Sequence, residues 1–418
     1  MSHVWSPADD PRLRRLERTA LIATGVDAVG TGSFVSAASV IFTQMLAVTP
    51  LVVGFGLTLS AVTGMIASLP VAAFADRIGK LRVFTLSYLF RAIGTMGWMF
   101  VHGDTMFLAY CAVFGIIDRS AASLTRSLII APLSHADSVR LIGKTALPGN
   151  AGYGLGAGLS ALVIFLGIPF VSILTVNALS FVMVVVLFNV ALRGEDVSRA
   201  RLGRSSISWA TIRLSLGDAK RRVVTWENFI FSFHRTLLNV YFPLLVVTRL
   251  PVVSWLVPVA FVLNAAVVGL VQGHANAWAD HGGRHATLWQ LAGFLLGVAI
   301  LGVGLLGYVD GWAVYSLAAF LLVSQIAAEI VHGAALAVYM VRLSRDNSLA
   351  TDLSAMNLGG QFQNIAGPTI FSALVSPTRW PLAVVFGVIV LVSAGLAGSR
   401  RRREWFVERT VEGGDGQD

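Results

Sequence analysis

The sequence predicts an all-α membrane protein with twelve transmembrane helices in two pseudo-symmetric six-helix halves. The 418 residues are 56% hydrophobic and only 13% charged, whereas soluble proteins carry about 25% charged residues. The mean hydropathy is +0.74. The segment 28–75 contains no charged residue, and its length accommodates two spans of about 20 residues each. A charged turn that occurs once in each half of the chain predicts the two-fold internal repeat.

Proline, glycine and charged residues divide the apolar sequence into segments of membrane-spanning length. In lipid the backbone must satisfy its own hydrogen bonds, so segments this long are expected to be helices. The alternating pattern of a transmembrane β-barrel is absent. The predicted spans are 19–48, 51–75, 83–101, 105–132, 142–167, 169–192, 226–248, 253–278, 287–309, 312–340, 352–376 and 380–399.

Basic residues are distributed unequally between the two sides that these spans define. Of the 31 lysines and arginines, 25 lie on the side of the N-terminus, while the opposite side has only Arg249 and Arg379. Positive residues concentrate on the cytoplasmic side of membrane proteins. We therefore expect both termini and the loop 193–225 to be cytoplasmic, in a cell (cytoplasmic or inner) membrane. Because topology accounts for the net charge of +9, we expect no nucleic-acid partner.

Cysteine usage and the absence of catalytic patterns argue against an enzyme. Cys111 is the only cysteine, so the chain contains neither an internal disulfide nor a cysteine metal site. We find no Ser/His/Asp arrangement, metal-ligand spacing or phosphate-binding loop. The sequence predicts no cofactor, no metal and no enzymatic activity.

The repeated turn reads "ADRIGK" at 75–80 and "ADHGGR" at 279–284. The two copies are 204 residues apart, and each lies between the second and third predicted spans of its half. Parallel repeats of this kind place a transport site between two six-helix halves. We predict an N-terminal half at 1–192, a cytoplasmic central loop at 193–225, and a C-terminal half with a cytoplasmic tail at 226–418.

These turns resemble the signature G-x-x-x-D-R-x-G-R-R of the major facilitator superfamily of transporters, and the resemblance extends over essentially the whole chain. In the first copy Ala72 replaces the first glycine, and Arg82 is displaced by one position. The resemblance implies a conformational latch made by both turns, with the first-copy aspartate helping to hold the halves together; its residues are Asp76, Arg77, Gly79, Lys80, Asp280, Gly283 and Arg284. The alternative is that these charges only set topology.

Ionisable residues inside predicted spans indicate function because each is costly in a bilayer. By resemblance to the family, spans 1, 4, 7 and 10 line a central cavity, and every such group except Arg91 falls on these spans. The candidates for proton coupling or the cavity are Asp27, Asp118, Arg119, Arg235, Glu329 and His332, with His234 nearby. The alternative is a set of structural ion pairs, most of all for Arg91. Arg126 and Glu227 lie near span ends, where snorkelling to the interface is expected.

Asp27 is the carboxylate that we expect to carry the proton, since it is the only acid in the first span. Burial favours its neutral form, and an arginine from the fourth or seventh span would favour its ionised form. Glu329 is the competitor, because it is equally deep and has His332 three residues further along a helix.

The fifth span carries glycines at Gly143, Gly152 and Gly156, which match part of the family's antiporter motif; Ala157 replaces its proline. Small residues also allow close helix packing, so packing without antiport stays open. The eleventh span has a similar stretch, "NLGGQFQNIAGP".

The resemblance and the charges together predict a monomeric secondary transporter in the lipid bilayer, with proton-coupled efflux of small, partly hydrophobic compounds. One alternative is proton-coupled uptake of a polar nutrient. An alternative from another class is a non-transporting membrane sensor or assembly factor on the same fold, which has less need of several buried ionisable groups.

Overall fold

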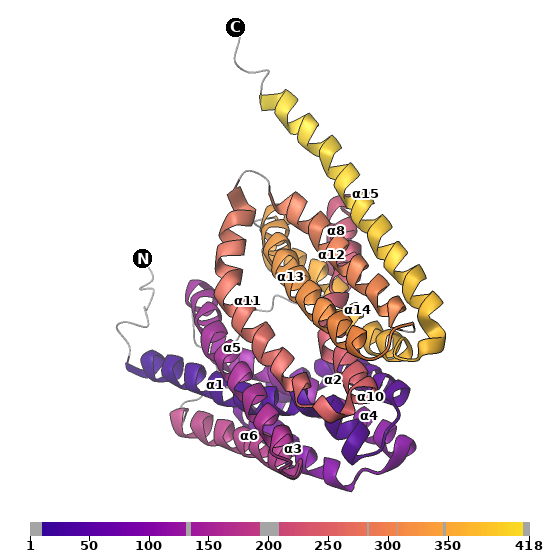
Figure 1. Cartoon of the computed structure of the whole chain (residues 1–418). Helices are drawn as coiled ribbons and strands as arrows, with labels where there is room; N and C mark the ends of the chain where they lie inside the picture. The colour runs from indigo at the N-terminus through magenta and orange to yellow at the C-terminus, as the bar shows by residue number, and fades with distance from the viewer. Residues whose placement is uncertain are drawn as a thin grey trace. The chain divides into compact units, whose positions relative to one another are not determined.

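The computed structural model describes residues 11–130, 135–192, 209–281, 284–306, 308–345 and 348–412. Within these ranges the regular structure is entirely helical (Figure 1). Each of the twelve predicted spans overlaps one helix or one unbroken run of helices, which confirms the all-α prediction.

The first six predicted spans correspond to six long helices. The first of them, α1, continues beyond Val40 as a π-helical turn, Ile41–Met45, and α3 ends in a short 3-10 turn, Trp98–Phe100. The helices are α1 (Pro11–Val40), α2 (Pro50–Ile78), α3 (Lys80–Gly97), α4 (Gly103–Ile130), α5 (His135–Phe165) and α6 (Val171–Ala191).

The seventh span differs from the others because it is divided into several helical pieces. A short helix, α7 (Trp209–Ser215), precedes it. The span then consists of α8 (Ala219–Phe231), α9 (Phe233–Thr236), a π-helical turn (Leu237–Tyr241) and α10 (Phe242–Arg249). The remaining helices are α11 (Leu256–Asp280), α12 (His285–Leu305), α13 (Trp312–Leu343), α14 (Leu349–Ala373) and α15 (Trp380–Glu412).

Proline and glycine account for the sharpest boundaries. Pro50 occupies the first turn of α2, where its missing N–H leaves no hydrogen bond unmade. Gly79, between α2 and α3, has φ 111°, a conformation that side chains other than glycine rarely adopt. The repeated turn therefore has a backbone that requires glycine in its first copy.

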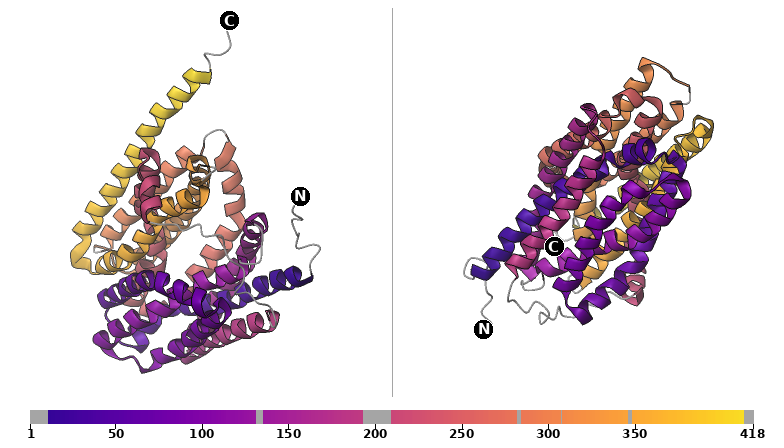
Figure 2. Two further views of the ribbon diagram at one scale, coloured as in Figure 1. Left: turned by 180° about the vertical axis from the view of Figure 1, so that it is seen from behind. Right: turned by 90° about the horizontal axis from the view of Figure 1, so that it is seen from below.

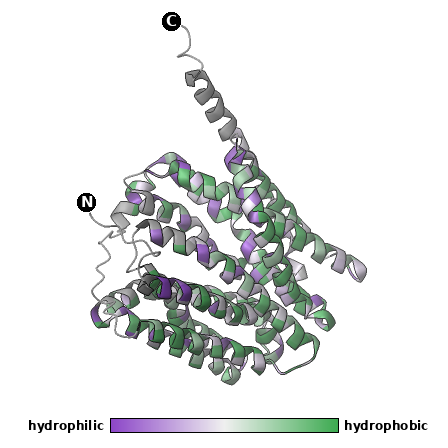
Figure 3. Ribbon diagram, turned by 90° about the vertical axis from the view of Figure 1, so that its left-hand side faces the viewer, coloured by the Kyte–Doolittle hydropathy of each residue, from purple (hydrophilic) through white to green (hydrophobic). Residues whose placement is uncertain are grey.

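Within the described ranges, eight helices or helical runs are long and apolar enough to cross a membrane, judged by length and composition. Figure 3 shows apolar residues along most of each helix. The helices of four other predicted spans, α3, α4, α5 and α14, are outside this group. Two of these, α3 and α4, carry ionisable residues of the candidate site.

The chain divides into two compact units. Unit 1 consists of residues 1–206 and 243–266, and unit 2 consists of residues 207–242 and 267–418. In unit 1, α1 packs against α5 and α6, and α3 packs against α4 and α6 (Figure 2). In unit 2, α12 packs against α13 and α15, and α14 packs against α8. The predicted division into halves at the loop 193–225 stays a prediction.

Candidate functional site

Arg91 of α3 joins two acids on different helices of unit 1. Its Nε–H donates a hydrogen bond to Asp118 Oδ1 of α4 at 2.9 Å. Its Nη1 lies 3.5 Å from Asp27 Oδ1 of α1, which is an ion pair longer than a normal hydrogen bond. We call these three residues the Arg91 triad.

Aromatic rings hold the Arg91 guanidinium in place. Its central carbon lies 3.9 Å from the ring centre of Phe181 and 4.9 Å from that of Tyr88, within the range of cation–π attraction. The Tyr88 hydroxyl is itself 2.9 Å from the Thr125 hydroxyl of α4. Arg91 is only 7% exposed. Packing and charge therefore fix the guanidinium between α1 and α4.

The arginine beside Asp27 therefore comes from α3. Among the described side chains Arg91 stabilises ionised Asp27, and the expected contribution of an arginine from the fourth span stays a prediction. The side chains of Arg119 and Arg126 lie outside the described part of the structure. Among the described side chains, two carboxylates share one guanidinium, so the triad has a formal charge of −1 when both are ionised.

The two acids of the triad are held differently. The side chains of Asp27 and Asp118 are 30% and 36% exposed, so both remain accessible. Asp118 accepts a short, charge-assisted hydrogen bond, which is the stronger kind of contact. Among the side chains that the structure describes, Asp27 contacts a cation only through the longer ion pair. Asp27 is therefore the carboxylate of the triad whose ionised form is less well stabilised.

Glycines of α5 position the helix that carries Asp27. A Cβ atom at Gly152 would collide with the backbone oxygen of Gly25, and one at Gly156 would collide with that of Val29. A Cβ at Gly143 would meet no atom within 4 Å. Two of the three predicted packing glycines thus lie at the contact between α1 and α5. The residues of α1 that they touch, Gly25 and Val29, lie two positions before and two positions after Asp27.

Unit 2 contains a buried imidazole pair in place of a charged triad. His234 Nε2 of α9 lies 3.2 Å from His332 Nδ1 of α13, and each residue is 1% exposed. One ring must donate and the other accept in such a contact, so the facing nitrogens hold one proton between them. The ring of Trp289 lies against His332 at 5.1 Å between centres.

Glu227 is buried inside the protein. It is 4% exposed, and its Oε2 accepts a hydrogen bond of 2.7 Å from Trp289 Nε1 of α12. The snorkelling expected of Glu227 is therefore wrong. The indole supplies the donor that makes burial of this polar group acceptable.

The other two candidates of unit 2 are Glu329 and Arg235. Glu329 accepts a 2.8 Å hydrogen bond from Gln325 Nε2, one turn earlier on α13. Arg235 of α9 is exposed, and no ion pair joins it to an acid within the described ranges. The two units therefore differ: the arginine of unit 1 is buried between acids, whereas Arg235 is accessible.

The repeated turns have separate local contacts. Arg77 is exposed and Lys80 is half-buried, while the Asp76 side chain lies outside the described part. In the second copy, Asp280 Oδ1 is 3.4 Å from Arg342 Nη2 of α13. Arg284 lies over the ring of Trp278 at 5.2 Å, and Gly283 is also outside the described residues. The latch role of these residues stays a prediction.

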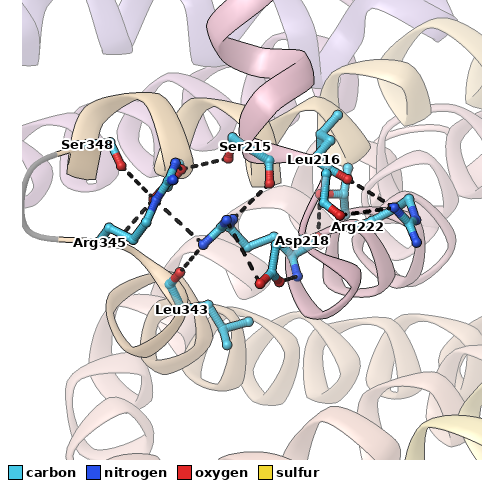
Figure 4. Close-up of polar contacts among 11 residues, drawn as sticks. Ser215, Leu216, Asp218, Arg222, Leu343, Arg345 and Ser348 are labelled. Carbon is cyan, nitrogen blue, oxygen red and sulfur yellow. Dashed lines mark hydrogen bonds and ion pairs between the residues drawn. The ribbon is translucent and has the colours of Figure 1, made fainter.

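Sequence reasoning missed a polar cluster where α7, α8 and α14 begin or end (Figure 4). At its centre the carboxylate of Asp352, which is fully buried, accepts hydrogen bonds from Arg345 Nε and Nη2 at 3.0 and 2.9 Å. Ser215 of α7 and Ser348 also donate to it. The signal available in the sequence was an acid in the first turn of an apolar helix, close to an arginine.

The same cluster fixes the start of α8. Asp218 is its N-cap and accepts a hydrogen bond of 3.0 Å from the Arg221 backbone N–H. This bond lowers the pKa of the Asp218 carboxyl below its ordinary value. The Arg221 side chain donates to the carbonyl groups of Ser215 and Leu343. The segment that enters the seventh span is thereby attached to the connection between α13 and α14.

Comparisons with known proteins agree with this helical architecture. Residues 20–368 match the sequence model described as Major Facilitator Superfamily. A bacterial homologue of the iron transporter ferroportin, in an inward-facing state, has a TM-score of 0.72 at 13% identity, over 93% of this chain and 98% of that chain. A bacterial homologue of the human lysosomal transporter Spinster has a TM-score of 0.71 at 13% identity, over 94% and 98%.

A third structure, the nucleoside transporter NupG, has a TM-score of 0.70 at 12% identity, over 92% of this chain and 98% of that chain. At such low identity these likenesses establish the fold alone. No curated protein matched the sequence.

Proposed function

Because the chain belongs to the Major Facilitator Superfamily, we propose that it is a proton-coupled secondary transporter that exports small, partly hydrophobic compounds by alternating access. In this proposal it is a monomer in a cytoplasmic membrane, with both termini in the cytoplasm. The neighbours include nucleoside, peptide and iron transporters, so fold alone does not select a substrate. The proposal therefore depends on the chemistry of the site.

The observation that carries the proposal is the charge balance of the Arg91 triad. Two carboxylates face one guanidinium inside predicted spans, and a surplus charge at such depth requires a counter-charge or neutralisation. A proton on one carboxylate makes the triad neutral. Asp27 is the carboxylate that we assign to this proton, because its contact with Arg91 is the longer one.

Exchange of that proton requires that the stabilisation of ionised Asp27 change as access alternates. Contact with Arg91 favours the ionised form, and loss of solvent favours the neutral form. A small movement of α1 relative to α3 alters the balance between these effects. The glycine contact between α1 and α5 allows the two backbones to approach closely beside Asp27, which supports a role for α5 in that movement.

Export is supported by the glycine pattern of α5, which resembles the antiporter motif of the family. The exposed parts of the Arg91 triad provide polar groups for a substrate that is only partly hydrophobic. The repeated turns, by resemblance, would latch alternate states.

A pH gradient imposed on reconstituted vesicles tests the proposal. We expect gradient-driven movement of amphiphilic compounds in the direction opposite to proton flow by the wild-type protein, and its loss in Asp27→Asn. Asp104→Asn is the matched control, since Asp104 lies at the first turn of α4 and contacts Thr49 rather than the triad. Transport that ignores the gradient in the wild-type protein would refute proton coupling, and movement in the same direction as protons would favour uptake.

A further inference from the structure

The Arg91 guanidinium is anchored both by an acid and by an aromatic ring on its face. Its Nε–H donates to Asp118 Oδ1 at 2.9 Å, and its central carbon lies 3.9 Å from the ring centre of Phe181 of α6. The distance from its Nη1 to Asp27 Oδ1 is 3.5 Å, which is about 0.7 Å longer than a charge-assisted hydrogen bond. A closer approach to Asp27 therefore requires the guanidinium to move away from an anchor.

The ring of Phe181 is itself fixed by its surroundings. Phe181 is 2% exposed, and its ring meets the ring of Tyr88 edge to face, with 5.8 Å between centres. The Thr125 hydroxyl donates to the Ala121 carbonyl group, so the Tyr88 hydroxyl is the donor in its contact with Thr125. Because both rings are held in this way, Phe181 can hold the guanidinium in place.

The residue before Phe181 fixes α6 against the helix that carries Asp27. A Cβ atom at Gly30 of α1 would collide with the side chain of Ser180, so Ser180 fills the space beside this glycine. Gly30 lies three residues after Asp27. Adjacent residues of α6 thus contact α1 and the guanidinium of α3, and α6 sets the separation between Arg91 and Asp27.

We propose that Phe181 is a positioning residue, whose ring keeps Arg91 at a distance from Asp27 and thereby allows Asp27 to take up a proton readily. A closer guanidinium would stabilise the carboxylate and oppose protonation. This inference deepens the proposed function and rests on it for the role of Asp27 in coupling. The effect of Phe181 on the protonation of Asp27 can be measured without transport.

Few other described side chains can change the charge of Asp27. On α3 and α4 they are Arg91, Tyr88 and Asp118, while the side chain of Arg119 lies outside the described part. The helix α6 contains no ionisable residue. On α5, Lys144 pairs with Glu17 and the ring of Tyr153 packs against Phe261. Arg91 is therefore the described cation whose position matters most for Asp27.

Carbodiimide labelling measures the protonation of Asp27 without a substrate or a gradient. Dicyclohexylcarbodiimide reacts with protonated carboxyl groups, and mass spectrometry identifies the labelled residue. We expect the pH midpoint of Asp27 labelling to fall by about one unit in Phe181→Leu, because the released guanidinium moves toward the carboxylate. Phe188→Leu is the matched control, since Phe188 is buried two turns further along α6 and packs against Phe84.

A fluorinated ring separates cation–π attraction from simple packing. Trifluorophenylalanine at position 181 keeps the shape of phenylalanine and weakens the negative ring face that attracts a guanidinium. We expect a shift in the same direction as in Phe181→Leu but smaller, and this variant serves even if Phe181→Leu does not fold. An unchanged midpoint in the fluorinated protein, or equal shifts in Phe181→Leu and Phe188→Leu, would overturn the proposal.

The positioning role and the proposed function can fail separately. A midpoint that is independent of Phe181, in a protein whose transport follows the pH gradient, would refute the positioning role alone. Wild-type transport that ignores the gradient would refute proton coupling and leave the effect of Phe181 on Asp27 labelling intact. Absence of Asp27 labelling at every pH in the wild-type protein would overturn both assignments.

Discussion

In unit 1, Gly156 of α5 lies against the backbone of α1 at Val29; in unit 2, Gly359 of α14 lies against the backbone of α8 at Thr225. Each contact joins the first and fifth predicted spans of its half. The polar groups beside these contacts differ. Unit 1 has the buried Arg91 between two acids, whereas unit 2 has the imidazole pair and the exposed Arg235. The units share this helix-packing contact and differ in charge, so we assign proton binding to unit 1.

Removal of each arginine gives the largest expected contrast. Arg91→Gln leaves two carboxylates together without their cation, and breaking a buried pair in this way costs about 3–5 kcal/mol. Arg235→Gln removes an accessible side chain without an acidic partner in the described structure, so we expect a change within about 0.5 kcal/mol. Thermal unfolding in detergent measures both. Addition of Asp118→Asn should recover part of the stability of Arg91→Gln; equal effects of the two arginines would contradict the contrast.

The glycine contacts should behave alike in the two units. Gly156→Ala and Gly359→Ala each place a methyl group against backbone atoms of the neighbouring helix, and overpacking of this kind costs about 1–3 kcal/mol. Gly143→Ala is the control, because its Cβ meets no atom within 4 Å. A destabilised Gly143→Ala, or an unaffected Gly156→Ala, would show that the helices approach differently.

Glu227 and Trp289 test the interior of unit 2. Trp289→Phe keeps an aromatic ring beside His332 but removes the indole donor to Glu227. Hydrogen bonds to charged groups contribute about 1.5–3 kcal/mol, and we expect a loss near the lower value. Glu227→Gln accepts the same indole hydrogen bond and should be affected less. The unfolding temperatures of the two variants measure these losses. A larger effect of Glu227→Gln would argue against a stabilising hydrogen bond from Trp289 to Glu227.

The smallest expected effect is at Asp218, the N-cap of α8. Its carboxyl has a lowered pKa in the folded protein, so its contribution is present above the ordinary aspartate pKa of about 3.9 and is lost as the pH falls through the lowered pKa. Asp218→Asn keeps the cap and loses the charge. We expect a stability difference below about 1 kcal/mol at pH 7 that shrinks as the pH falls below the ordinary aspartate pKa of about 3.9. A difference that grows on acidification would contradict this sign.

The sequence allowed the helices to be predicted because uninterrupted apolar segments of that length have no other stable form in lipid. It did not reveal their rotation, since a helix that is apolar all round has no distinctive face. For this reason a structural ion pair could be expected of Arg91 without its partners, which are Asp27 and Asp118. Glu227 was assigned to the interface for the same reason, because its donor, Trp289, comes from a helix 62 residues away.

The interrupted seventh span was also beyond prediction. Nothing in "FHRTLLNVYF" (residues 233–242) distinguishes a π-helical turn from an α-helix, yet the turn Leu237–Tyr241 begins two residues after Arg235 and three after His234. The contact of Gly359 with the backbone of α8 depends on the distance between α8 and α14, which no local pattern contains. Residue identity indicated the candidates, whereas three-dimensional packing determined their partners.

The assignment of proton binding to unit 1 is tested most directly by measuring proton movement in vesicles that contain Asp27→Asn or Glu329→Gln. We predict that Asp27→Asn abolishes substrate-induced proton movement and retains substrate exchange, because an amide resembles the protonated acid. Glu329→Gln should keep proton movement. Intact coupling in Asp27→Asn together with lost coupling in Glu329→Gln would transfer the proton to unit 2 and contradict the assignment.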